Sequence, residues 1–434
     1  MAQVKSDSAI IEDDIESFSN FVKYVSERPE LESRFILPQW KDKEFDDSIN
    51  LKSIFITSTI KNAIERYLHL FNEFEFDKKK AQMVVDEIQN FIFCKTLPID
   101  IVVPILFVKF DFEKYEITDG VEVRRLTKEE QLARFKIKSY SVSVNDSVLS
   151  SATHALVLKD WQVKNSNSMS EFNILTNIQA YPIERIDKFF GAVRVARDFN
   201  TGYAQVLSIG KNWIHNCKAN LPHIEGTSIR SFPSYFENYY WNVESIPSVS
   251  TDEIVIIGDM FIKLLDASEK SIDLAVNRLN QCLVRDKEED SVLDATIALE
   301  ALLSDDGNQE MTHKLAMRVG ALSKLSNDLD KTPQQSFKDI KSIYGYRSAI
   351  VHGSKKLDKK RVIKIDDQHE ITAHSMAVQY LKAILSVLIN NPEYRDPKNI
   401  DSVLLPWQCR VFHNHAASGS LVLKSCLYFA IIIR

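Results

Sequence analysis

Residues 344–357 read YGYRSAIVHGSKKL, and the fold of the C-terminal half depends on how this stretch is interpreted. The spacing of its apolar residues predicts a helix over 337–352, and Gly353 suits the left-handed residue that often follows a helix end. Arg347 and His352 lie five positions apart, which is about 140° around an ideal helix. One regular helix therefore does not direct both side chains to one small ligand. They converge if the last turn is distorted, or if a second copy of the helix faces the first.

Helical patterns surround this stretch. A polar segment with a proline, IPSVSTDE (246–253), predicts a helix start with Ser250 or Thr251 as the cap. Two prolines in NPEYRDP (391–397) end the helical region, so we expect an all-α bundle over 249–395. Apolar residues recur at spacings of three and four over 252–286, 289–304, 310–327, 334–352 and about 371–390.

The N-terminal half mixes helix and strand patterns, so the expected fold class is an α+β domain over 21–248 followed by the helical bundle. Residues 51–95 are mostly helical in pattern, and IDKFFGAVRVARDF (186–199) predicts another helix. Asp119-Gly120 between two alternating runs predicts a hairpin. The other strand-like segments are IDIVVPILFVKFDF (99–112), FKIKSYSVSV (135–144) and THALVLKDWQVK (153–164).

Two further segments have simpler interpretations. Residues 1–20 are expected to be a flexible acidic arm, and 396–434 a C-terminal tail. The aromatic segment RSFPSYFENYYWNV (230–243) predicts a loop or strand. Its side chains are either core or a binding face, and they are Tyr235, Phe236, Tyr239, Tyr240 and Trp241.

The composition excludes several kinds of chemistry. Only 11 glycines occur in 434 residues, and neither a P-loop nor a G-x-G-x-x-G motif is present, so a nucleotide cofactor has no evident site. The five cysteines include no C-x-x-C pair, which argues against a zinc ribbon or a disulfide scaffold. His413 and His415 have no accompanying acidic cluster. We therefore expect no metal and no cofactor.

The location of the protein is also expected from its sequence. The N-terminal residues are acidic and lack the apolar core of a signal peptide. The C-terminal SLVLKSCLYFAIIIR is shorter than the roughly 20 residues that span a bilayer. We therefore expect a cytoplasmic protein without a membrane partner. The net charge of -6 does not exclude nucleic acid, because a local basic stripe suffices for binding.

A carboxylate stands in the apolar stripe of VLDATIALEALL. Glu300 shares a helical face with Leu293 and Ile297, and burying an unpaired carboxylate is costly. Glu300 either reaches water at the edge of the stripe or pairs with Arg318 or Arg347. Taken alone, Arg318 predicts an ion pair on the surface or between helices.

A basic run follows the opening stretch. KKLDKKRVIK spans 355–364 and holds six cations against one acid. Such a run is either a solvated loop or a contact to a phosphate backbone. The candidate RNA-binding residues are Lys355, Lys356, Lys359, Lys360 and Arg361.

Three segments follow one another along the chain: LAVNRLNQCLVRDKEEDSVLDATIALEALL (274–303), KLAMRVGALSKL (314–325) and YGYRSAIVHG (344–353). In this order they resemble the Apea-like HEPN family, which is found among bacterial defence proteins. The last segment carries the R-x4-H signature of HEPN domains. DGVEVRRLTKEEQLARF (119–135) is also similar to a segment that often precedes this domain.

The resemblance implies a metal-independent endoribonuclease that acts as a homodimer of its helical domain. Arg347 and His352 correspond to the catalytic pair. Ser348 stands where many HEPN nucleases have Asn, Asp or His, so its orienting role is kept by a hydroxyl. Glu300, Tyr344 and Arg318 are expected to support the site.

RNA carries its own nucleophile, the 2′-hydroxyl, so a histidine and a forked guanidinium are sufficient for cleavage. The expected products are a 2′,3′-cyclic phosphate and a 5′-hydroxyl. The α+β half is expected to sense or restrain, with a phage-derived trigger or inhibitor protein as a candidate partner. The alternative is a non-catalytic HEPN scaffold that binds RNA, nucleotide or a partner protein. On its own, His352 could equally be a helix-capping residue.

Overall fold

The structure is a computed structural model that describes most of the chain between residues 51 and 404. The expected acidic arm falls outside the described residues except at isolated positions, and the C-terminal tail is described only as far as residue 404. The described residues are 51–137, 142–165, 175–214, 221–239, 246–267, 269–305, 311–355, 357–365 and 369–404, with isolated positions between 16 and 28.

The chain forms two compact units, called here the sheet unit and the helical unit. The sheet unit contains residues up to Ile105, Phe112–Tyr181 and Tyr203–Arg230; the helical unit contains the remainder. This division differs from a single boundary near residue 248, because α8 (Ile183–Arg197) and β2 (Lys109–Phe110) belong to the helical unit. Buried Arg194 of α8 explains this, since its guanidinium donates to the side chain of Asn280.

The sheet unit is built on six strands. The hairpin predicted at Asp119-Gly120 is confirmed, because β3 and β4 pair antiparallel and Gly120 has a φ of 71°. The pairs that β5 makes with β4 and β1, and that β1 makes with β6, are also antiparallel. The strand order is β3 (Lys114–Thr118), β4 (Val121–Arg125), β5 (His154–Lys164), β1 (Thr96–Pro104), β6 (Tyr203–Gly210) and β7 (Ile224–Ser231).

One face of this sheet is covered by α5 (Lys128–Arg134). Ala133 of α5 packs in a core cluster with Val102, Val157 and Leu207. The other elements of the unit are α3 (Leu51–Phe71), α4 (Lys78–Phe93), α6 (Asp146–Ser150) and the 3-10 turn η3 (Ile178–Ala180). The helices predicted over 51–95 are confirmed as α3 and α4.

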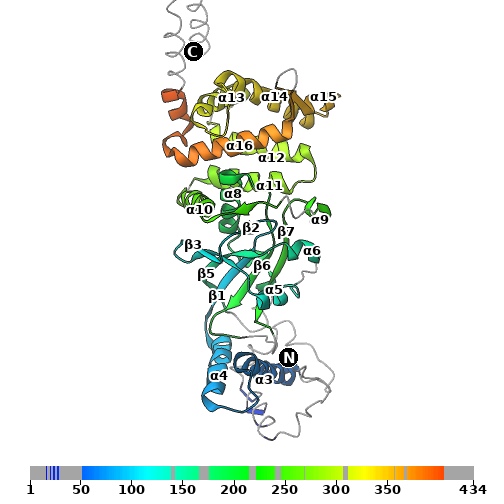
Figure 1. The fold of residues 1–434 in the computed structure, drawn as a ribbon, viewed down its shortest axis with the longest axis vertical. Helices are drawn as coiled ribbons and strands as arrows, with labels where there is room; N and C mark the ends of the chain where they lie inside the picture. The colour runs from blue at the N-terminus through cyan, green and yellow to red at the C-terminus, as the bar shows by residue number, and fades with distance from the viewer. Residues whose placement is uncertain are drawn as a thin grey trace, which may run out of the picture. The chain divides into compact units, whose positions relative to one another are not determined.

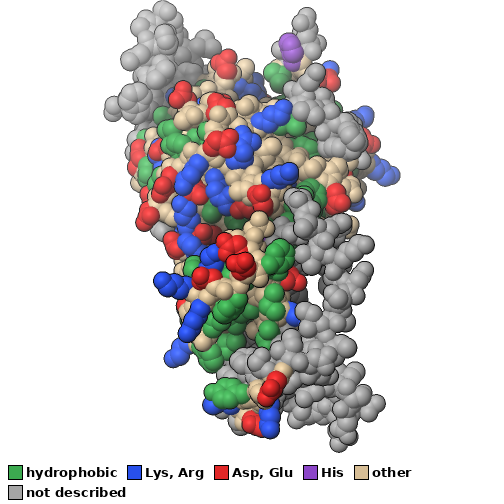
Figure 2. Space-filling model, turned by 60° about the horizontal axis from the view of Figure 1, so that its bottom comes forward, with side chains coloured by type: hydrophobic (Ala, Val, Ile, Leu, Met, Phe, Trp, Pro, Cys, Tyr) green, Lys and Arg blue, Asp and Glu red, His purple; other side chains and the backbone are tan. Residues whose placement is uncertain are grey.

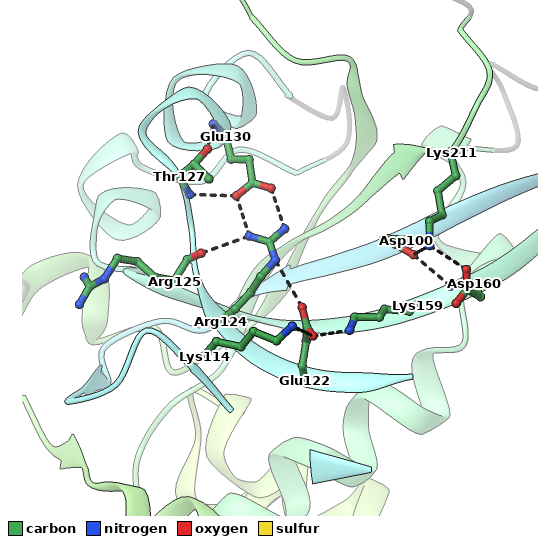
Figure 3. A network of polar contacts seen from close by, with 10 residues as sticks. All are labelled: Asp100, Lys114, Glu122, Arg124, Arg125, Thr127, Glu130, Lys159, Asp160 and Lys211. Atoms are coloured by element: carbon green, nitrogen blue, oxygen red, sulfur yellow. Dashed lines mark hydrogen bonds and ion pairs between the residues drawn. The ribbon is translucent and has the colours of Figure 1, made fainter. Parts of the chain in front are cut away.

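A charged network ties the segment 119–135 together (Figure 3). Glu122 is buried and pairs with Lys114 at 2.9 Å and with Lys159. Arg124 donates through both terminal nitrogens to Glu130 of α5, at 2.9 and 2.7 Å. Glu130 also accepts from the backbone of Thr127, which completes a capping box. The acids and bases of this segment thus join the hairpin to β5 through Glu122 and to α5 through Arg124.

After α8, the next long helix of the helical unit is α10 (Thr251–Asp266). Ser250, one of the two predicted cap residues, caps it, and Glu253 completes the capping box. Its later helices are α11 (Lys270–Val284), α12 (Glu288–Leu303), α13 (Met311–Leu322), α14 (Pro333–Val351), α15 (Leu357–Arg361) and α16 (Ala373–Asn390). The short elements are α9 (Phe236–Tyr239), β8 (Ser248–Val249), η5 (Ser323–Leu325), β9 (Val362–Lys364), β10 (Glu370–Thr372), η6 (Pro392–Tyr394), α17 (Pro397–Asn399) and the π-helical turn η7 (Ile400–Leu404).

Helix α16 is the centre of this unit. It packs against α8, α11, α12 and α14, and in Figure 1 it runs between the pair α13 and α14 and the pair α11 and α12. Its sequence is apolar on nearly every side, as expected for a helix surrounded by others.

Three expectations about elements are wrong in part. The single helix expected over 252–286 is two helices, α10 and α11. No glycine or proline stands between them, and both pack against α8, so tertiary contacts decide the break. Within the described part of 135–144 there is no strand. Phe236 begins the short helix α9 instead of a strand, and it is core, with its ring 4.2 Å from that of Phe107.

Candidate functional site

Helix α14 carries the candidate catalytic residues, and its sequence fixes both of its ends. Thr332 caps the N-terminus in a capping box with Gln335, and Pro333 occupies the first turn. The C-terminal cap is His352, with φ −98° and ψ 6°. Gly353 follows in the left-handed region at φ 58°, as predicted.

Backbone hydrogen bonds close this end as a Schellman motif. The N–H of Ser354 donates to the carbonyl of Ala349 at 2.9 Å, and that of Gly353 to Ile350 at 3.2 Å. Because these carbonyls are satisfied by the backbone, the side chain of His352 is not needed to cap them. His352 and Ser348 are both exposed, so both side chains are accessible to a ligand.

Arg347 is the partner of Glu300. Its Nη2 lies 3.5 Å from Oε1 of Glu300 on α12. The side chains are 36% and 21% exposed, so the pair lies at the surface of the unit. The Nε atom of Arg347 is buried without a hydrogen-bond partner among the described residues. The guanidinium is therefore held by Glu300 through one terminal nitrogen, while the hydrogen-bonding capacity of its buried Nε is unused among the described residues.

Tyr344 supports this pair from the interior. Its hydroxyl donates to the carbonyl of Thr296 on α12 at 3.3 Å. Burial raises the pKa of Tyr344 well above its ordinary value, and the Glu300 carboxylate raises it further, while Arg347 lowers it. Tyr344 therefore stays protonated near neutral pH and acts by packing and positioning.

Arg318 lies in a different cluster. Its guanidinium donates to both carboxylate oxygens of Asp401 at 2.9 and 2.5 Å, to Asp305 at 2.8 Å and to the carbonyl of Leu303 at 2.5 Å. The side chain is almost fully buried. Arg318 thus joins α12, α13 and η7, which agrees with the interhelical ion pair expected for it. Glu300 pairs with Arg347 instead of Arg318.

The basic run is only partly free. Arg361 donates to Glu288 at 2.8 Å, and the ammonium of Lys360 donates to the carbonyl of Gly345 at 3.0 Å. Lys355 and Lys359 are exposed, and among the described residues neither makes an ion pair. Lys356 lies outside the described residues. On the face drawn in Figure 2, lysines and arginines are interspersed with acids.

Sequence reasoning missed several acidic residues that pair with arginines. Asp294 is buried and pairs with Arg278 at 2.6 Å and Arg285 at 2.8 Å. Its place in the apolar run VLDATIALEALL was a signal of the same kind as that of Glu300. Glu288 and Asp401 carry no such local signal.

The part of the chain that the structure describes holds neither a metal-binding cluster nor a membrane-spanning helix. No group of three or more His, Cys, Asp or Glu side chains is arranged there to hold a metal ion. His413 and His415 are outside it. None of the helices described is both long enough and apolar enough to cross a bilayer.

Comparison with known proteins gives no match: no family model, no curated protein and no solved structure matches the chain.

Proposed function

We propose that the chain is a metal-independent endoribonuclease whose helical unit is an Apea-like HEPN domain. It acts in the cytoplasm in anti-phage defence by abortive infection, or as a toxin. The observation that carries the proposal is the exposed C-terminal end of α14, where His352 is accessible and Arg347 is half-exposed beside Glu300.

The chemistry needs two proton transfers and charge stabilisation. The 2′-hydroxyl of RNA attacks the adjacent phosphorus, its proton goes to a base, and the 5′-oxygen leaves with a proton from an acid. Imidazole suits the proton transfers near neutral pH. The guanidinium of Arg347 donates two hydrogen bonds to non-bridging phosphate oxygens. The products are a 2′,3′-cyclic phosphate and a 5′-hydroxyl.

One copy of α14 supplies one imidazole, whereas this reaction uses a base and an acid. A homodimer of the helical unit supplies two. The φ and ψ of His352 depart from the helical values, so its side chain is directed by the Schellman end as well as by the helix period. The partner that activates or restrains the nuclease is proposed to be phage-derived and to act through the sheet unit.

The test is cleavage of single-stranded RNA by purified protein with and without EDTA. Wild type is expected to cleave equally in both, and His352→Ala and Arg347→Ala to lose about 10²–10⁴-fold in rate. Matched controls are His69→Ala and Arg125→Ala; Arg125, like Arg347, pairs with one glutamate, at 2.7 Å from Glu113. Cleavage that requires magnesium or leaves a 5′-phosphate contradicts the mechanism.

A non-catalytic scaffold remains the second candidate, and one observation favours it. Glu300 already pairs with Arg347, so the guanidinium has a carboxylate partner without RNA. Overexpression in cells separates the two candidates. Toxicity of wild type that His352→Ala abolishes supports the nuclease, whereas equal toxicity, or none in either, supports the scaffold.

A further inference from the structure

The residues after the His352 cap fold back onto the bundle. Leu357–Lys364, called here the basic strap, comprises α15 and β9. The ammonium of Lys360 donates to the carbonyl of Gly345 at 3.0 Å, and Gly345 precedes Arg347 by two positions. The strap therefore lies alongside the turns of α14 that carry the candidate site.

A second contact ties the strap to another helix. Nε of Arg361 lies 2.8 Å from Oε2 of Glu288, the first residue of α12. This hydrogen bond lowers the pKa of the Glu288 carboxyl and raises that of Arg361. Two cations of the strap, Lys360 and Arg361, are thus engaged with the bundle.

The other described cations of the basic run are Lys355, Lys359 and Lys364. On an ideal helix Lys359 and Arg361 are about 160° apart, so Lys359 faces away from α12. Lys364 lies 3.8 Å from Glu370 of the adjoining strand β10. Lys355, three residues after His352, is exposed. Lys355 and Lys359 are consequently the cations available beside the candidate site.

We propose that Lys355 and Lys359 contact the RNA backbone, whereas Arg361 is a positioning residue that holds the strap to α12 through Glu288. This assignment rests on the proposed ribonuclease function and divides the basic run into two roles. Arg361 then affects RNA binding through the place of the strap and makes no phosphate contact of its own.

Charge reversal tests the division. The probe is a fluorescein-labelled single-stranded RNA with 2′-O-methyl groups at every ribose, which cannot be cleaved because it lacks the nucleophile. Arg361→Glu is expected to weaken binding about five-fold, since it replaces an exposed ion pair with repulsion. Glu288→Arg/Arg361→Glu restores the pair at unchanged net charge, and its dissociation constant is expected within about two-fold of wild type.

The matched control is Glu288→Arg/Lys359→Glu, which has the same net charge but no pair to restore. It is expected to remain weak. Lys355→Ala and Lys359→Ala are each expected to reduce the salt slope of binding by about 0.7, the value for one contact to a single strand, while the charge swap leaves the slope unchanged. Circular dichroism and urea midpoints establish that every variant is folded.

The outcomes separate this proposal from the function on which it rests. A charge swap that stays as weak as Arg361→Glu shows that Arg361 touches RNA and overturns the division. Rescue by the swap together with absence of cleavage of unmodified RNA supports the division and refutes the nuclease. Wild type that neither binds nor cleaves refutes both.

Discussion

Arg318→Ala is expected to destabilise the helical unit by about 3 kcal/mol without removing a group from the candidate site. The substitution leaves the carboxylates of Asp305 and Asp401 without their shared cation. It also removes the donor at 2.5 Å from the carbonyl of Leu303.

The magnitude follows from burial. Removing one partner of a buried ion pair costs about 3–5 kcal/mol. Here the aspartates rehydrate in part, because the Asp305 side chain is 23% exposed and that of Asp401 42%. Solvent screening therefore reduces this contribution to about 2 kcal/mol. An unsatisfied buried carbonyl adds about 1 kcal/mol, which gives the total.

Urea unfolding followed by circular dichroism measures this loss. Asp401 is in η7, so faster proteolysis after residue 399 is expected as well. Arg361→Ala is the control; its ion pair is exposed, and its loss is expected to change stability by less than about 0.5 kcal/mol. If Arg318→Ala unfolds within 1 kcal/mol of wild type but loses RNA cleavage, the structural role assigned to Arg318 is wrong.

Variants at three further positions test the site and its surroundings. Gly353→Ala is expected to cost about 1 kcal/mol in urea unfolding, and Gly353→Asn less, because φ is 58° and no atom lies within 4 Å of an added Cβ, so backbone strain acts alone. Burial lowers the pKa of His374, so the unfolded chain binds a proton more readily than the folded chain. Wild type is therefore expected to lose stability as pH falls below about 6.5, and His374→Gln is expected to lose less stability over the same pH range. Tyr344→Phe is expected to lose about 1 kcal/mol in urea unfolding and less than ten-fold in cleavage rate, because its hydroxyl positions and does not transfer a proton.

Local signals in the sequence predict most helices and strands, and the exceptions have physical causes. The capping boxes at Ser250 and Thr332 and the left-handed Gly353 are short-range features, so they can be read from a few residues. The break between α10 and α11 cannot, because it is decided by packing against α8. Packing also decides that α8 belongs to the helical unit, because Arg194 of α8 contacts Asn280, which lies 86 positions away along the chain.

The sequence likewise predicts only part of the candidate site: it shows that Glu300 needs a partner but not which residue is that partner. Helical spacing places Glu300 and Arg347 in or beside apolar stripes, and it predicts that the carboxylate needs a partner. Which arginine provides it depends on where α13 and α14 lie. Arg318 is taken by Asp401, 83 positions away, and no periodicity could predict that pair. Charge counting likewise overestimates the number of unpaired cations in the basic run, because Arg361 already has a carboxylate partner in Glu288.

Under the proposed function, an RNA phosphate competes with Glu300 for the guanidinium of Arg347. A half-exposed ion pair at 3.5 Å is worth about 1 kcal/mol or less, so it orients the guanidinium without fixing it. A phosphate accepts two parallel hydrogen bonds from the same fork, and such charge-assisted bonds are about twice as strong as neutral ones. Under the proposed function, we therefore expect an RNA phosphate to displace the carboxylate at small cost, so that Glu300 orients the arginine only until RNA is bound.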